Sequence, residues 1–525
     1  MNKKIINFLF FFISFFLIFN NIPKIIQMNF LGGPVQSKLV FYPLFTGFIY
    51  TIYSQYKYKN VLVNFDKFIK FIFIYCSVIF ISLIIGLYNY PYYDLVINGP
   101  VMQIEKLPKV MAFLDSLGIN IDQKVLIAFW MVARVVKGLL FDTFYTFGGA
   151  YMIYCWYHND WQKGVNIFIK GILTGLVVVL VYGCIEMFYL AGNVTAKNIL
   201  SALNPYIHVI KVDHGWWPPL LWNKQVRSVF AEPSFFSIWS AFALPFVWYK
   251  FFVSKQLISS FLFAIVITIF ETLIFLTNAR TGVALFCGVF TCLLIYLLFI
   301  RKELALRKFV GITVCAASAF IFSNYFINTF INKTNVEAFN TKTIENYYEN
   351  NLASISKVNA RSNGARYATI YANIMIGVDN PILGVGKNLV PAYMPDYFPN
   401  YVENNREVQN WIKYQKEEGI LKVPIPSFCA YSLVFAESGI LGLFSYLLPA
   451  LLLIWSILKI LNKDYFRFEY LFLLISLLGI LASGFSNTLN ITYCYWVLLG
   501  LGYAMCFGKE NDVKSNGNTS DKQEH

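Results

Sequence analysis

Long apolar runs separated by short polar segments dominate the chain. About 20 apolar residues in a helix cross the hydrocarbon core of a bilayer, and most of these runs approach or exceed that length. None of them alternates polar and apolar residues, as the strands of a membrane barrel must. The pattern therefore predicts about twelve transmembrane helices, near residues 5–19, 39–53, 68–88, 125–156, 165–190, 235–252, 257–276, 282–300, 309–326, 429–458, 470–485 and 491–507.

Two polar segments between the runs are long. One covers residues 191–232, and the other, residues 331–426, is the only part large enough to form a small subdomain. We therefore predict transmembrane helices 1–9 and the loop 191–232 within residues 1–330, the large loop 331–426, and transmembrane helices 10–12 within residues 427–507. The polar tail 508–525 is predicted to be disordered.

The composition leads to the same class, an all-α polytopic integral membrane protein. Hydrophobic residues make up 58% of the chain and charged residues 13%, about half of the roughly 25% found in soluble domains. The net charge is +14, but no basic run is long enough to follow a nucleic-acid backbone, so nucleic acid is not an expected partner. The nine cysteines are scattered singly, which predicts no disulfide framework and no metal site. No cofactor is expected either.

Basic residues in the short loops indicate the orientation. With the N-terminus inside, the inner side holds roughly 17 lysines and arginines, against roughly 10 in the short outer loops. Both termini are therefore predicted to be cytoplasmic, with the segments 191–232 and 331–426 outside. The bias towards Lys, Asn, Ile and Phe is typical of AT-rich bacterial genomes. We therefore expect a multi-pass protein of a bacterial cytoplasmic (inner) membrane.

Arginines at membrane depth are candidate functional residues, because placing a charge there is costly. Arg280 stands in the very short outer turn 276–282, which keeps it at the depth of a lipid phosphate. It could instead anchor a headgroup or pair with Glu271 on the preceding helix. Arg134 lies within the long run 125–156, where a functional position at the outer boundary and simple snorkelling to the interface are equally good interpretations.

Further candidates lie in the two outer segments. Arg227 comes shortly before Glu232 and Pro233, and Pro233 suits the first turn of the helix that follows. Glu232 would then face that helix's N-terminus, either as a cap or as a catalytic carboxylate. Arg366 precedes a glycine-rich stretch in the large loop. His208 is a weaker candidate, because a lone loop histidine is more often a solvated surface residue.

These motifs, in this order, resemble the O-antigen polymerase and ligase superfamily of bacterial surface-polysaccharide assembly. The resemblance covers roughly Arg227 to Leu443. The residues that carry it are Arg227 with Glu232-Pro233-Ser234, then Asn278-Ala279-Arg280-Thr281-Gly282, then Arg366 with Asn380-Pro381-Ile382-Leu383-Gly384-Val385-Gly386, and last Pro426-Ser427-Phe428 leading into Ala436-Glu437-Ser438-Gly439-Ile440-Leu441-Gly442-Leu443.

The resemblance implies a GT-C-like, metal-independent glycosyltransferase that acts outside the membrane on undecaprenyl-diphosphate-linked oligosaccharide. Outer-face arginines of such enzymes hold the diphosphate, a role that falls here to Arg227, Arg280 and Arg366, with Arg134 as a further candidate. Fixed guanidinium groups in a poorly hydrated site stabilise the charge of a departing diphosphate. Glu232 and Arg280 are the expected catalytic residues. The expected partners are the lipid-linked oligosaccharide and the membrane, and a chain-length regulator protein is left open.

One departure from the family pattern bears on the reaction. Ligases of the superfamily carry a histidine just before the last motif, where this chain has Phe428 and Cys429. The difference favours a polymerase of repeat units of an O-antigen, capsule or exopolysaccharide over a ligase, which stays the alternative. It also leaves the base for the acceptor hydroxyl open, and Glu232 is the best candidate by placement. A flippase for lipid-linked oligosaccharide is a second alternative, but the ionisable residues concentrate at the outer face, which favours an enzyme.

Overall fold

A computed structural model describes residues 2–28, 36–59, 61–100, 103–210, 218–300, 303–332, 363–462 and 467–508. Within these residues the regular structure is entirely helical. The first half contains α1 (Lys3–Phe16), η1 (Lys24–Ile26), α2 (Phe41–Tyr58), α3 (Asp66–Tyr88), α4 (Tyr93–Ile97), α5 (Leu107–Ser116), α6 (Gln123–Thr143), η5 (Phe144–Gly148), α7 (Gly149–Tyr157), α8 (Trp161–Leu190) and α9 (Val194–Ile207). The second half contains α10 (Pro233–Val253), α11 (Leu257–Leu276), α12 (Arg280–Ile300), α13 (Glu303–Phe326), η6 (Ile327–Ile331), α15 (Asn363–Asp379), α16 (Val390–Tyr397), η8 (Asn400–Asn404), α17 (Arg406–Glu418), α18 (Ala430–Leu461), α19 (Phe468–Ser483) and α20 (Cys494–Phe507).

Eleven of the twelve apolar runs predicted from the sequence each correspond to one of these helices, and the run 125–156 is divided among α6, η5 and α7. Among the described residues, seven helical segments are by themselves long and apolar enough to cross a membrane, namely α3, α8, α10, α11, α12, α13 with η6, and α18. Helices α19 and α20 are apolar but shorter. The predicted class, an all-α polytopic membrane protein, is therefore confirmed.

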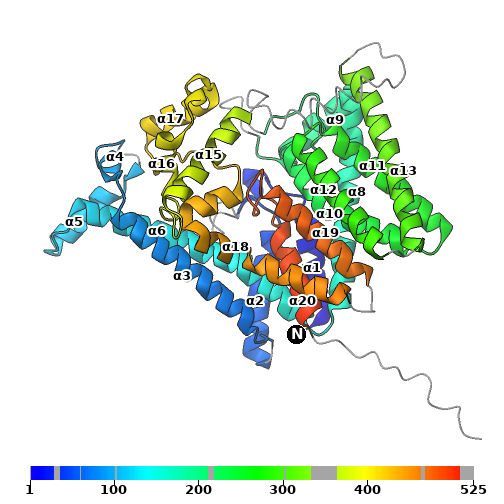
Figure 1. Ribbon diagram of the computed structural model, residues 1–525, viewed down its shortest axis with the longest axis horizontal. Coiled ribbons are helices and arrows are strands. Elements are labelled where there is room, and N and C mark those ends of the chain that lie inside the picture. The colour runs from blue at the N-terminus through cyan, green and yellow to red at the C-terminus, as the bar shows by residue number, and fades with distance from the viewer. Residues whose placement is uncertain are drawn as a thin grey trace, which may run out of the picture.

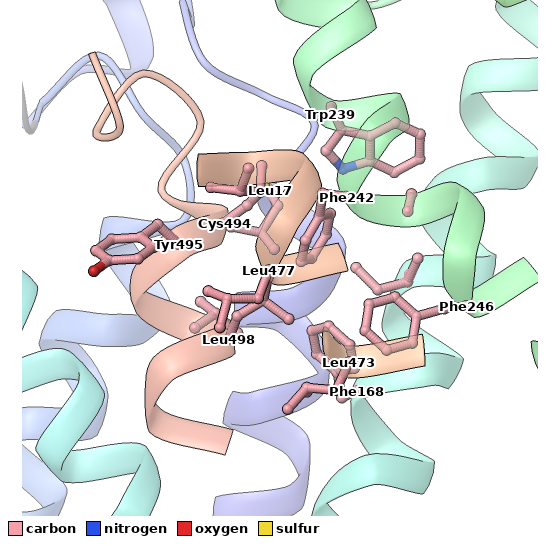
Figure 2. Packing of buried hydrophobic residues seen from close by; sticks show 14 of the residues in the cluster. Leu17, Phe168, Trp239, Phe242, Phe246, Leu473, Leu477, Cys494, Tyr495 and Leu498 are labelled. Carbon is pink, nitrogen blue, oxygen red and sulfur yellow. The ribbon is translucent and has the colours of Figure 1, made fainter. Parts of the chain in front are cut away.

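The larger hydrophobic core is built around α10. This helix is apolar on every side, and such a helix is expected in the interior rather than at a surface. Its residues Trp239 and Phe242 lie in the same buried cluster as Phe168 of α8 and as Leu473 and Leu477 of α19, as Figure 2 shows. Helix α10 begins at Pro233, as the sequence predicts, because a proline at the first helical position leaves no backbone donor unsatisfied.

A second hydrophobic core joins the segment 363–428 to the first part of the chain. Figure 1 shows α15, α16 and α17 beside α3 to α6 and α18, on the opposite side of the molecule from α11 to α13. The cluster combines Leu83 of α3 and Ile127 of α6 with Ile376 of α15 and Met394 of α16. The described part of the predicted loop 331–426 is therefore anchored on transmembrane helices. Residues 333–362 of that loop, and the tail from 509 onward, lie outside the described residues.

Candidate functional site

Two glycine-rich motifs that lie far apart in the sequence are bonded to each other through their backbones. Helix α18 is broken at Gly439, whose φ of 63° and ψ of −162° are not helical. The break leaves backbone groups of the helix without their normal partners, and the loop 380–389 supplies replacements. Four backbone hydrogen bonds connect the two segments, from Val385 N–H to Ala436 O at 2.9 Å, Gly386 N–H to Glu437 O at 2.9 Å, Ile440 N–H to Pro381 O at 2.8 Å and Leu441 N–H to Ile382 O at 3.4 Å.

Close approach of the backbones explains the glycines of these motifs. A Cβ atom on Gly439 would lie 2.2 Å from the carbonyl carbon of Ile382, and one on Gly384 would lie 2.4 Å from the carbonyl oxygen of Ala436. Both glycines also have positive φ values, which side-chain-bearing residues adopt only with strain. Helix α3 packs against both motifs. Its Ser82 Oγ donates a hydrogen bond to the backbone carbonyl oxygen of Glu437 at 2.7 Å.

The interlocked motifs place a cation next to a buried carboxylate. The carboxylate of Glu437, only 5% exposed, lies 3.6 Å from Nζ of Lys387. Its other oxygen accepts the backbone N–H of Asn388 at 2.9 Å. The Glu437 carboxylate raises the pKa of Lys387 above its usual range, and burial opposes this shift only partly. The ammonium group therefore stays charged, and it balances a carboxylate that apolar surroundings would otherwise destabilise.

Glu437 opens onto a cavity of about 510 Å³. We refer to it as the Glu437 cavity. Its polar lining residues are Arg134 of α6, Asn388, Ser427, Glu437 and Thr488, and the remaining walls are apolar. Nη2 of Arg134 donates to the carbonyl oxygen of Leu421 at 3.0 Å, which holds the guanidinium at the wall of the cavity.

Arg280 and Arg366 line a second cavity, of about 270 Å³, which we call the two-arginine cavity. Arg280 is the first residue of α12, directly after the short turn from α11, and Arg366 lies in the first turn of α15. The guanidinium of Arg366 lies over the ring of Phe428, 5.0 Å from its centroid, within the range of a cation–π interaction. The cavity therefore brings together two of the three arginines predicted to converge. Its other lining residues are Thr281, Ala284, Leu285, Asn363, Tyr367, Ile370, Phe428, Ala482, Phe485 and Ser486.

The two cavities are neighbours, because two short stretches of chain contribute to both. Ser427 lines the Glu437 cavity and the next residue, Phe428, lines the two-arginine cavity. In the same way, Thr488 lines the first and Ser486 the second. Nδ2 of Asn373 on α15 donates to Ser427 Oγ at 2.7 Å and fixes the first of these stretches.

Arg227 lies among the lining residues of neither cavity. Its side chain has no exposed surface and donates to the carbonyl oxygens of Leu220 at 3.1 Å and Ala231 at 3.3 Å. Nε lies 3.9 Å from a carboxylate oxygen of Glu186 on α8, and the other oxygen of Glu186 accepts the backbone N–H of Arg227 at 3.0 Å. These contacts hold the segment before α10 against α8, so the Arg227–Glu186 pair has a structural role.

Glu232 and His208 are also placed away from the cavity linings. Glu232 occupies the N-cap position of α10, but its carboxylate makes no capping bond and accepts a hydrogen bond from Ser234 Oγ. His208 is 2% exposed. Burial, with a smaller effect of the Arg227 guanidinium, lowers the pKa of His208 to about 3, so its imidazole is neutral at physiological pH. The expected solvated surface histidine is in fact a buried one.

The family model described as O-antigen ligase matches residues 263–447, a region that runs from α11 into α18 and contains Arg280, Arg366 and Glu437. This match places residues 263–447 in the O-antigen ligase and polymerase superfamily. Members of this family are glycosyltransferase-like enzymes that act on lipid-linked oligosaccharides. No curated protein matches the chain.

The sequence alone indicated three of the four charged residues that line the two cavities, namely Arg134, Arg280 and Arg366. It did not indicate the pair formed by Glu437 and Lys387. Glu437 is the only acidic residue within the apolar run 429–458, and the cost of a charge at that depth could have marked it. The same signal applies to Glu186 in the run 165–190. Among the described residues, no three His, Cys, Asp or Glu side chains come together as a metal site requires.

Proposed function

We propose that the chain is a polymerase that joins undecaprenyl-diphosphate-linked repeat units of a surface polysaccharide. The observation that carries this proposal is the two-arginine cavity, to which α12 and α15 each contribute one arginine. Cleavage of a glycosyl diphosphate leaves negative charge on the departing diphosphate. Two guanidinium groups at one cavity can neutralise this charge with paired, charge-assisted hydrogen bonds.

The lipid-linked donor already carries an activated anomeric carbon, so the reaction needs no nucleotide. The chemical work of the protein is to hold the diphosphate, to align the acceptor hydroxyl and to receive its proton. Preorganised donors directed at developing charge are the largest contribution in comparable reactions. Arg280 and Arg366 fit this role, whereas the buried contacts of Arg227 with Glu186 favour a supporting role for Arg227.

The polymerase is preferred over a ligase because of the residue at position 428. In ligases of the superfamily the sequence pattern has a histidine at this point of the chain, whereas the phenyl ring of Phe428 lies beneath Arg366 and next to Trp411, with ring centroids 5.9 Å apart. A phenyl ring cannot accept a proton. The ligase stays the second candidate, because the matching family model bears the name O-antigen ligase.

We also propose that the cavities face the outside of a bacterial cytoplasmic membrane and that both termini are cytoplasmic. The excess of lysine and arginine in the short loops on the N-terminal side supports this orientation. The oligosaccharide units of a surface polysaccharide would then meet the enzyme on the side where the polymer is needed. A chain-length regulator protein is a further candidate partner.

A reconstituted assay tests the proposed function. Purified protein in liposomes receives carrier-linked repeat units extracted from a strain that lacks the gene, and the glycans are resolved on a gel. A ladder of longer glycans is expected from these units alone. If glycan is transferred only after a lipid or protein acceptor is added, the ligase replaces the polymerase as the proposed function.

Arginine variants test the diphosphate site in the same assay. Arg280→Lys and Arg366→Lys should each lower the transfer rate by about 100-fold, because Lys offers a point charge in place of two parallel hydrogen bonds. Arg406→Lys, at an exposed position of α17 outside both cavities, is the matched control and should behave as wild type. Normal ladders from both cavity variants, at normal protein levels, would exclude the two-arginine cavity as the diphosphate site.

A further inference from the structure

The Glu437 cavity contains one acidic side chain, and this side chain has unused capacity to accept hydrogen bonds. A carboxylate has about four acceptor sites on its two oxygens. The described contacts of the Glu437 carboxylate are the N–H of Asn388 and the ammonium of Lys387. Both fix the position of the carboxylate, and both leave it able to accept a further hydrogen bond from a ligand in the cavity.

The lining of this cavity suits a ligand with many hydroxyl groups. Arg134 can only donate, Glu437 in its ionised form can only accept, and Ser427 and Thr488 can do both. A volume of about 510 Å³ lies within the usual range of small-molecule sites. The apolar walls between these groups, such as Met131 of α6, can contact the C–H faces of a sugar ring. An isoprenoid chain would contact these walls but would leave the polar groups of the lining without hydrogen-bond partners from the ligand.

The position of the cavity next to the two-arginine cavity defines what such a ligand would do. Ser427 lines one cavity and Phe428 the other, so an acceptor in the first would lie next to a diphosphate-linked sugar in the second. Effective displacement requires the attacking oxygen within about 3–3.5 Å of the reacting carbon. Sites for acceptor and leaving group that are lined by adjacent residues, as these two are, are the arrangement that such a displacement needs.

We propose that the Glu437 cavity binds the acceptor sugar and that Glu437 is the base that removes the proton from the attacking hydroxyl. This inference rests on the proposed glycosyl transfer. The acceptor oxygen forms a bond to the anomeric carbon, and the bond from that carbon to the diphosphate oxygen breaks. The electron pair of the broken bond leaves with the diphosphate towards Arg280 and Arg366, and the hydroxyl proton passes to the Glu437 carboxylate, which later releases it to water. The base role, predicted for Glu232, is thereby assigned to Glu437.

Steady-state transfer to a soluble acceptor tests the base. The acceptor is the repeat-unit oligosaccharide released from the carrier by mild acid and labelled at its reducing end, and the donor is the carrier-linked repeat unit. Glu437→Gln keeps the shape and the bond to Asn388, so it should lower kcat by about 100-fold or more, with the donor KM unchanged. Glu417→Gln, which alters an exposed carboxylate of α17, is the matched control and should have no effect. A Glu232→Gln variant, assayed in parallel, should retain most of its kcat.

A second variant tests the cavity without touching the buried pair. Thr488 is exposed at the cavity wall, so Thr488→Trp should narrow the cavity while the protein still folds. The acceptor KM should rise at least tenfold, with binding of undecaprenyl diphosphate unchanged. Thr46→Trp, at an exposed position of α2, controls for the added indole and should leave both parameters unchanged.

The outcomes separate this inference from the proposed function. If the wild-type protein makes no transfer product in any of these assays, the proposed function itself is wrong. If wild type transfers and Glu437→Gln retains its kcat, or if Glu232→Gln alone abolishes transfer, Glu437 is not the base. If Thr488→Trp weakens undecaprenyl diphosphate binding and leaves the acceptor KM unchanged, the cavity holds the isoprenoid chain and the acceptor assignment is wrong. The Thr488 result decides the cavity even where Glu437→Gln fails to fold.

Discussion

Replacing Gly439 by alanine should separate the loop 380–389 from the kink in α18, and these two segments hold Glu437 and Lys387 at the Glu437 cavity. Gly439 has φ 63° and ψ −162°, a backbone region that only glycine occupies readily, and placing another residue there costs of order 1–3 kcal/mol. The new Cβ would also lie 2.2 Å from the carbonyl carbon of Ile382. Because that neighbour is backbone rather than a flexible side chain, the loop 380–389 must move away.

The movement removes hydrogen bonds in addition to the strain. The bonds from Ile440 N–H to Pro381 O at 2.8 Å and from Leu441 N–H to Ile382 O at 3.4 Å lie nearest to the clash. Each contributes about 1 kcal/mol net, and more where a buried donor is left unpaired. With the backbone strain, the expected loss is about 3–6 kcal/mol. For a chain of 525 residues, a loss of this size lowers the melting temperature by roughly 3–5 °C.

Thermal unfolding of detergent-purified protein, followed by tryptophan fluorescence, measures this loss. Gly288→Ala is the matched control, because Gly288 is an exposed residue of α12 whose added Cβ would meet no heavy atom within 4 Å. Its melting temperature should equal or slightly exceed that of wild type. Glycosyl transfer by Gly439→Ala should also fall, since Lys387 moves with the loop. A Gly439→Ala protein that melts with wild type would refute the argument that backbone contact at the kink requires glycine.

Three further predictions concern the fold and its orientation. Arg227→Ala leaves the Glu186 carboxylate buried without its cation, so stability should fall by about 3–5 kcal/mol, seen as a lower melting temperature; unchanged stability with lost transfer would instead support a binding role. The pKa of His208 is about 3 in the fold and about 6.5 in an unfolded chain, so unfolded protein takes up the proton first and stability is lost as the pH falls from about 6.5 towards 3. His208→Phe should flatten the melting temperature over this pH range, and an unchanged slope would contradict the assignment. A cysteine at exposed Glu417 should react with a membrane-impermeant maleimide in intact cells while one at Lys57 does not, and the reverse pattern would overturn the orientation.

The sequence by itself determined the helices and the place of Arg280. A membrane span is a local property, because about 20 consecutive apolar residues suffice to specify it. Every predicted run is helical, although the run 125–156 is divided among α6, η5 and α7. Pro233 marked the start of α10 for an equally local reason. The very short segment between two apolar runs was enough to place Arg280 at the turn between them, and the structure has it as the first residue of α12, directly after that turn. The order of the motifs was enough to identify the superfamily.

Only the tertiary structure decided which charged residues share a site. Arg227 and Arg280 look alike in the sequence, since both stand next to apolar runs, yet Arg227 is buried against Glu186 while Arg280 lines a cavity with Arg366. A costly charge at membrane depth indicates that some partner exists, but not whether that partner is another side chain or a ligand.

The pairing of the two glycine-rich motifs was equally hidden from the sequence. Backbone hydrogen bonds between residues 381–386 and 436–441 have no side-chain pattern of their own, and the kink at Gly439 exists because those bonds replace helical ones. The contact that sets Lys387 beside Glu437 therefore depends on how α3, α15 and α18 pack together. No local window of the sequence contains all three helices, so the shape and charge of the Glu437 cavity could be known only once the chain had folded.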